Sequence, residues 1–184
     1  MLYQVYDFSH FMAAPMRAMA NFTKAMMLHP LVPATGYARA MAAGAELIER
    51  TTRRYDKPKW MLDTTDIDGQ KVPVTVKTVM HKPFCNLLRF ERKTTKQDPK
   101  VLIVAPMSGH HATLLRGTVE AMLPEHDVYI TDWIDARLVP LSAGKFDLED
   151  NVAYIMDFMR HLGPDVHVMA VCQPAVPVLC AVSL

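Results

Sequence analysis

The sequence predicts an α/β fold in which a mostly parallel sheet follows an N-terminal helical segment. Beyond residue 60, short runs rich in β-branched residues alternate with longer amphipathic segments, and Gly and Pro separate many of them. The first 60 residues are rich in Met and Ala and show no strand alternation. We therefore expect a helical segment over residues 1–60 and part of an α/β domain over residues 61–184.

The helical segment is predicted to form two helices, separated by Pro30 and Pro33. Methionine and aromatic side chains recur along one side of each helix. Such a stripe usually packs into a core, where Met fills irregular gaps, and the alternative is a surface that adheres to a hydrophobic partner. The stripe residues are Phe11, Met12, Met16, Met19, Phe22 and Met26 in the first helix and Tyr37, Met41, Ala45, Ile48 and Tyr55 in the second.

The α/β part begins with strand signals. Residues 63–70 form a polar turn, after which residues 72–80 alternate and predict a first strand. Cys85 to Arg92 form its expected antiparallel partner across a Lys-Pro turn. The continuous apolar run over residues 101–106 predicts a buried third strand.

Two further strands and their helices complete the domain. A helix that ends at Pro124 leads to a fourth strand over residues 127–133. Asp147 can cap a helix that Gly163-Pro164 terminates, and residues 165–171 then predict a fifth strand, covered on both faces. The apolar positions of that helix are Leu148, Val152, Ile155, Met159 and Leu162.

Cys172 directly follows the fifth predicted strand and is the candidate nucleophile. Pro174 fits the first turn of a following helix, so a strand-to-helix turn presents Cys172 over a helix N-terminus, where an anion is favoured. The backbone N–H of Gln173 there can hold an oxyanion. Cys85 and Cys180, without such a context, are expected to be core residues.

This order of elements is that of the α/β-hydrolases, in which the loop after the third strand supplies the second oxyanion donor. Ser108 and Gly109 occupy that loop. His110 and His111 flank it and are candidate substrate contacts, since a general base is expected to follow the nucleophile in the chain. The elbow reads Ala170-Val-Cys-Gln-Pro174, so alanine and proline stand where the usual motif has glycines.

Four blocks carry a more specific resemblance: Met1-Leu-Tyr-Gln, residues 100–117, residues 128–137 and Val171-Cys-Gln-Pro-Ala-Val-Pro-Val178. With them the chain resembles the intracellular polyhydroxyalkanoate (polyhydroxybutyrate) depolymerases over essentially all of its residues. The resemblance implies that Cys172 is the acyl-accepting nucleophile, and that the substrate is a 3-hydroxyalkanoate polyester stored as cytoplasmic granules. The related polyhydroxyalkanoate synthases also use a cysteine on this fold but keep glycines around it, which favours a depolymerase.

The resemblance also implies a catalytic aspartate and histidine downstream of the nucleophile. None of the eight histidines follows Cys172. We therefore expect the chain to match the N-terminal half of such an enzyme, truncated after the elbow, to be inactive alone, and to expose the edge of its fifth strand. The alternative is a non-catalytic granule-associated or interaction protein that retains half of the hydrolase fold.

Charge and composition narrow the function classes. With 20 basic and 19 acidic residues, the net charge of +1 gives no electrostatic case for nucleic acid. The three cysteines are irregularly spaced, which predicts no disulfide framework. His161 and His167 lack the spacing of metal ligands, and we expect no metal site and no cofactor. No apolar run approaches the ~18 residues of a membrane span, and the N-terminus lacks the pattern of a secretory signal. We expect a cytoplasmic protein, at polyester granules if the resemblance holds.

Overall fold

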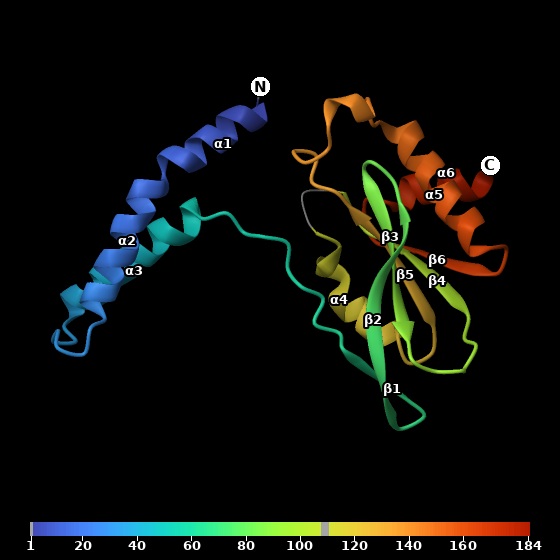
Figure 1. The fold of residues 1–184 in the computed structure, drawn as a ribbon, viewed down its shortest axis with the longest axis horizontal. Coiled ribbons are helices and arrows are strands. Elements are labelled where there is room, and N and C mark those ends of the chain that lie inside the picture. The colour runs from blue at the N-terminus through green and yellow to red at the C-terminus, as the bar shows by residue number, and fades with distance from the viewer. Residues whose placement is uncertain (1, 108–110) are drawn as a thin grey trace. The chain divides into compact units, whose positions relative to one another are not determined.

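The computed structural model describes residues 2–107 and 111–184. The chain forms two compact units, Met1–Asp56 and Lys57–Leu184, so the expected boundary after residue 60 falls just inside the second unit (Figure 1). Among the described residues, no helix is both long enough and apolar enough to cross a membrane.

The N-terminal unit holds three helices, α1 (Leu2–Met12), α2 (Ala14–Met27) and α3 (Gly36–Thr52), where the sequence predicted two. The first predicted helix is interrupted at Ala13 because Pro15 cannot donate a backbone hydrogen bond to the preceding turn. The Thr35 side chain caps α3 by accepting the N–H of Ala38 at 3.2 Å.

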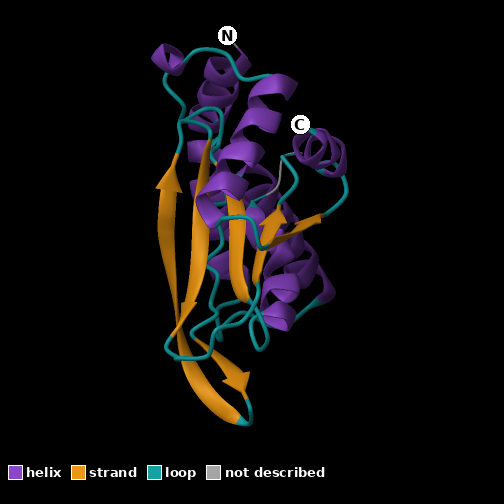
Figure 2. Ribbon diagram, turned by 90° about the vertical axis from the view of Figure 1, so that its right-hand side faces the viewer, coloured by secondary structure: helices purple, strands orange, loops and turns teal. Residues whose placement is uncertain are grey.

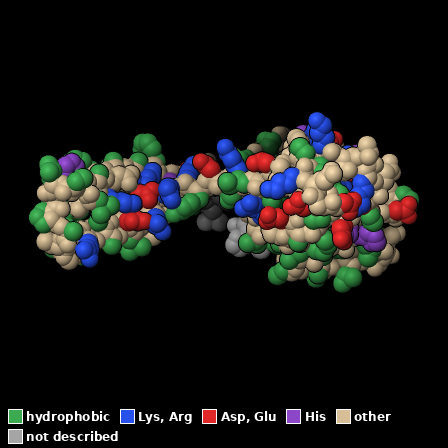
Figure 3. Space-filling model, turned by 90° about the horizontal axis from the view of Figure 1, so that it is seen from below, with side chains coloured by type: hydrophobic (Ala, Val, Ile, Leu, Met, Phe, Trp, Pro, Cys, Tyr) green, Lys and Arg blue, Asp and Glu red, His purple; other side chains and the backbone are tan. Residues whose placement is uncertain are grey.

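Small side chains form the buried part of the α2–α3 hairpin. They are Ala20, Ala38, Ala42 and Ala45. The large apolar residues lie outside this contact, and Phe11, Met19 and Phe22 are 73%, 72% and 70% exposed. Figure 3 shows hydrophobic side chains at the surface of this unit. The methionine and aromatic stripe is therefore not the hairpin's own core.

The second unit contains a six-stranded sheet in the order β1-β2-β3-β5-β4-β6 (Figure 2). Its strands are β1 (Thr64–Ile67), β2 (Gln70–His81), β3 (Cys85–Arg92), β4 (Lys100–Val104), β5 (Asp127–Trp133) and β6 (Val166–Ala170). The strands predicted from the sequence are all present, but the sheet is mixed, and the expectation of a mostly parallel sheet is wrong. β4 pairs in parallel with β5 and β6, whereas β1–β2, β2–β3 and β3–β5 are antiparallel. Short turns join β1, β2 and β3, and such connections permit only antiparallel pairing.

The sequence interpretation missed β1 by reading residues 63–70 as a turn. The turn itself is two residues, Asp68 and Gly69, with φ of 51° and 80°. Positive φ at both central positions is typical of a type I′ hairpin, for which Asp-Gly is a favoured pair. Thr64–Ile67 thereby pairs back onto the start of β2.

Each face of the sheet has its own core. The 3₁₀ turn η1 (Ala112–Leu115) and α4 (Arg116–Met122) cover one face, where they pack with Val101 and Ile103 of β4. Helices α5 (Leu148–Leu162) and α6 (Ala175–Ser183) cover the other, where Leu102 and Val104 contribute. A second 3₁₀ turn, η2 (Leu141–Ala143), lies between β5 and α5. Alternate residues of β4 point to opposite faces, so its apolar residues 101–104 serve both cores.

Helix α5 begins and ends where its local signals predict. Asp147 accepts the N–H groups of Glu149 and Asp150, the Asp150 side chain completes a capping box, and Gly163 ends the helix with φ of 96°. Its buried face, however, is Asn151, Ile155, Phe158 and Leu162. The predicted apolar stripe had the helical period, but it was centred one residue away from the observed buried face. Leu148, which the prediction included in the stripe, is exposed.

Strand β6 is the last strand of the sheet and pairs with β4 alone among the described strands. Val166, Val168 and Ala170 are half-buried against one core and Met169 against the other, while His167 is exposed, so the expectation of a strand covered on both faces is confirmed only in part. The open edge that the sequence led us to expect is present, and its backbone N–H and C=O groups have no strand partner in the described chain.

Candidate functional site

The carboxyl ends of β4 and β6 form a topological switch point. The two strands are parallel neighbours, but the chain leaves β4 toward α4 on one face and leaves β6 toward α6 on the other (Figure 1). Open α/β sheets bind ligands at the carboxyl ends of strands whose connections diverge in this way. Cys172 lies two residues beyond the end of β6.

Cys172 adopts an unusual backbone conformation. Its φ is +67°, in the left-handed region that costs a residue with a Cβ about 1–3 kcal/mol. The Cys172 carbonyl accepts the N–H of Ala175 at 3.1 Å, and the Pro174 carbonyl accepts that of Val178 at 3.0 Å. These bonds turn the chain from β6 directly into α6, and the thiol-bearing residue at the apex is exposed. A strained strand-to-helix turn with an exposed thiol resembles the turn that presents the nucleophile in α/β-hydrolases, and we call it the elbow.

Two other described residues with a Cβ also have a positive φ. One lies in a turn that explains its conformation, and the other has no nucleophilic side chain. Asp68 belongs to the β1–β2 hairpin turn, and Met61, with φ of 51°, bears an unreactive thioether and accepts a hydrogen bond from Arg116 at its carbonyl. Cys172 is therefore the position where strain coincides with reactive chemistry.

Side chains of β5 hold the backbone of Ala105, the first residue after β4. The pairing of β4 with β5 extends to Ile103, two residues before Ala105. The Ala105 N–H donates to Thr131 Oγ1 at 2.8 Å, and the Ala105 carbonyl accepts from Trp133 Nε1, also at 2.8 Å. Both backbone groups of a residue that is 1% exposed are thus satisfied.

Met107 is the last described residue of the segment that follows β4, and it contacts two other elements. Its backbone N–H donates to the side-chain oxygen Oε1 of Gln173 at 2.8 Å. The amide nitrogen Nδ2 of Asn151, on α5, lies 3.5 Å from Met107 Sδ. The loop after β4, the elbow after β6 and the start of α5 therefore meet at one point beside Cys172.

The predicted site residues are only partly brought together. Gln173 directly follows Cys172 at the elbow, as predicted. Ser108, Gly109 and His110, the other expected oxyanion donors and substrate contact, lie outside the described residues.

His111 is the residue before η1. In the loop after β5, hydrogen bonds from the Arg137 side chain lower the pKa of Asp135.

Sequence reasoning missed two polar groups near this edge. Asn151 is buried, and no described residue donates to its Oδ1. Asp132, near the end of β5, is also buried and forms an ion pair with Lys57. A polar residue four positions before Ile155, in line with the buried face of α5, is the signal that could have identified Asn151.

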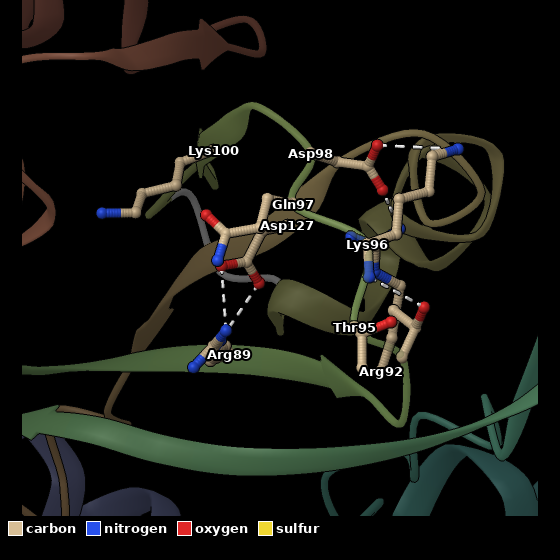
Figure 4. A pocket seen from close by; sticks show the side chains of 9 residues that line it. Arg89, Arg92, Thr95, Lys96, Gln97, Asp98, Lys100 and Asp127 are labelled. Carbon is tan, nitrogen blue, oxygen red and sulfur yellow. Dashed lines mark hydrogen bonds and ion pairs between the residues drawn. The ribbon is translucent and has the colours of Figure 1, made fainter.

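A cavity of about 560 Å³ lies at the opposite, amino end of the parallel strands (Figure 4). Its arginines are already paired: Arg89 makes a two-pronged contact with Asp127 at 3.0 Å, and Arg92 donates to Asp98 at 2.8 Å. Lys96 pairs with Asp98 at 3.6 Å, and Lys100 donates to the Leu162 carbonyl at 2.6 Å. Each cation that lines the cavity thus has an internal partner, so the cavity gives no reason to infer a ligand.

The other two cysteines differ from each other. Cys85 is fully buried, as expected, and burial raises the pKa of its thiol. Cys180 is exposed, so the expectation of a core residue is wrong for it. It lines an apolar groove of about 360 Å³ between α5 and α6, together with Val152, Met156 and Leu184.

Among the described residues, no group of three or more His, Cys, Asp or Glu side chains is placed to hold a metal ion. No protein-family model, no curated protein and no solved structure matches this chain.

Proposed function

We propose that this chain carries the nucleophile half of an acyl-transfer site of the α/β-hydrolase type, in which Cys172 attacks an ester. The observation that carries the proposal is the φ of +67° at an exposed cysteine, directly after a parallel strand at a switch point. A cysteine that only fills a hydrophobic core is buried and has a relaxed backbone. A packing role therefore does not account for the strain and the exposure of Cys172.

The chemistry follows from the elbow. The Cys172 thiolate attacks the ester carbonyl carbon, and the carbonyl electron pair moves to oxygen. The backbone N–H of Gln173 and the expected donors after β4 stabilise this oxyanion. Collapse of the tetrahedral intermediate breaks the ester C–O bond, the alkoxide leaves and takes a proton from water, and a thioester remains on Cys172. Water then hydrolyses the thioester to the free acid and restores the thiol.

The second step needs a base that moves protons, worth about 10²- to 10⁴-fold in rate. The resemblance implies a general-base histidine that comes after the nucleophile in the chain, and none of the eight histidines does. We therefore expect this chain to form the thioester and to release it slowly.

The substrate class rests on the resemblance carried by the four sequence blocks. We infer a 3-hydroxyalkanoate polyester, which makes the chain part of a cytoplasmic polyhydroxyalkanoate depolymerase acting at polymer granules. A second function is favoured by the N-terminal unit, where Phe11, Met19 and Phe22 are exposed. Such a surface suits a non-catalytic protein that adheres to an apolar granule.

Incubation of the full chain with amorphous poly(3-hydroxybutyrate) granules separates the two functions. The enzyme proposal predicts hydroxybutyryl groups bound to Cys172 as thioesters that hydroxylamine removes, and none in Cys172→Ala. Granule binding that is equal in both proteins, with no acyl group on Cys172, would contradict the enzyme proposal and support the adhesion function.

A further inference from the structure

We propose that helices α1 and α2 present a self-association surface, on which a second copy of this chain packs to form a helical bundle. The surface belongs to the N-terminal unit alone, and its role is independent of the chemistry proposed for Cys172. We call it the methionine face. Its members are 46% to 73% exposed, and they are Phe11, Met12, Met16, Met19, Phe22 and Met26.

The methionine face points away from the helix that already packs on α2. Its members in α2 recur at steps of three and four residues, so they share one side of the helix. The side toward α3 holds buried Ala20 and both cations of α2. Lys24 pairs with Glu46 of α3 at 3.3 Å, and Arg17 donates to the Thr52 carbonyl at 2.6 Å.

The area of this face is that of a specific interface. A fully exposed side chain of this size presents about 150–250 Å², so six of them at the observed exposure leave about 550–900 Å² uncovered. A standard protein–protein interface buries about 800 Å² on each partner. Soluble monomers rarely expose contiguous apolar patches larger than a few hundred Å². The alanine seam of the hairpin therefore leaves enough apolar surface outside it for a stable dimer.

The spacing of the face fits a second copy in the antiparallel orientation. A two-fold interface has to be complementary to itself. The members in α2 lie nearly symmetrically about the point between residues 20 and 21. A two-fold axis at that point brings Met16 of one copy beside Met26 of the other, and Met19 beside Phe22. Two α2 helices then pack along their apolar sides, with α3 outside, as in antiparallel helical bundles.

The charges of α2 favour a copy over the surface of an apolar granule, which the adhesion function would place here. Helices that lie in an interface carry Lys and Arg on a polar side that remains in water. The polar side of α2 is instead engaged by α3 through Arg17 and Lys24. With these cations held on the opposite side, two methionine faces meet without like charges between them.

Sedimentation equilibrium of the full chain tests this surface. At about 50 µM we expect a dimer of twice the chain mass of 20.7 kDa, because interfaces of this size bind in the micromolar range or more tightly. Met19→Lys places an unpaired ammonium group from each copy in the apolar contact. The dissociation constant should then rise by at least about 100-fold. Phe22→Lys, at the other side of the same contact, should have the same effect.

Leu47→Lys is the matched control. Leu47 is also exposed, but it lies two positions from buried Ala45 and so on the side of α3 away from α2. This variant should keep the dissociation constant within about twofold of the parent. All three substitutions are at exposed residues, so each variant should retain the helical circular dichroism signal of the parent.

A parent chain that is monomeric at about 50 µM would overturn the proposal, since an interface of this area would hold it together. A dimer that neither Met19→Lys nor Phe22→Lys weakens would also overturn it, because another surface would then associate. A monomeric parent that binds poly(3-hydroxybutyrate) granules, and loses that binding in Met19→Lys, would make the polymer the occupant of the face in place of a second copy.

Discussion

Thr131 Oγ1 accepts the backbone N–H of Ala105 at 2.8 Å, and both residues are buried. This side chain substitutes for a strand partner at the point where β4 leaves the sheet. It therefore links the packing of β5 to the position of the loop beside the elbow.

Thr131→Val keeps the shape of the side chain and removes the acceptor. The Ala105 N–H is then buried without a partner, which costs about 1–3 kcal/mol of unfolding free energy. Urea unfolding followed by circular dichroism measures the loss. Thr75→Val on the exposed side of β2 is the control and should be nearly neutral. A loss no larger at Thr131 than at Thr75 would show that the hydrogen bond contributes nothing.

Strain at Cys172 can be measured directly. Glycine accepts φ of +67° without a Cβ penalty, so Cys172→Gly should be more stable than Cys172→Ala by about 1 kcal/mol. Urea midpoints of the two variants provide the comparison, and both lack the thiol. If Cys172→Ala is the more stable variant, the residue is not held in a left-handed conformation.

Tyr129 should titrate late. Burial, and next the negative charge of Asp127, raise the pKa of Tyr129 to about 12. Its hydroxyl also donates to Asp127 Oδ2 at 3.0 Å. Because the folded pKa exceeds the unfolded value of about 10, the stabilising contribution is complete below pH 10 and is lost as the pH rises toward 12. Ultraviolet titration of tyrosinate should show a late component that Tyr129→Phe removes. A titration curve unchanged by that substitution would contradict the buried environment.

Phe158 anchors the core between α5 and the sheet and is fully buried. Phe158→Ala should lower the unfolding free energy by about 3–5 kcal/mol through lost burial and a cavity. Leu179→Ala, at a residue 65% exposed on α6, should change it by less than about 0.5 kcal/mol. Similar denaturant midpoints for the two variants would be inconsistent with the packing described.

Local signals made part of this structure predictable. Asp147 and Gly163 mark the ends of α5, and Pro174 after a β-branched run indicates the turn at Cys172. These effects act within a few residues, so the sequence reveals them.

Long-range contacts were not predictable in the same way. The bond between Met107 and Gln173 joins residues 66 positions apart, and it depends on β6 lying beside β4. The mixed pairing of the sheet depends on which strands become neighbours, which side-chain periodicity does not specify. The apolar pattern predicted for α5 was centred on Leu148 and Val152, so the predicted buried face did not include Asn151.

The central claim is that Cys172 is an acyl-accepting nucleophile. Mass mapping of the chain after brief exposure to the 4-nitrophenyl ester of 3-hydroxybutyrate tests it most directly, since Cys85 and Cys180 serve as internal references. The account predicts one hydroxybutyryl group per chain, on the peptide that contains Cys172, and a matching single burst of 4-nitrophenolate. Equal labelling of Cys172 and Cys180, or no labelling of Cys172, would contradict it.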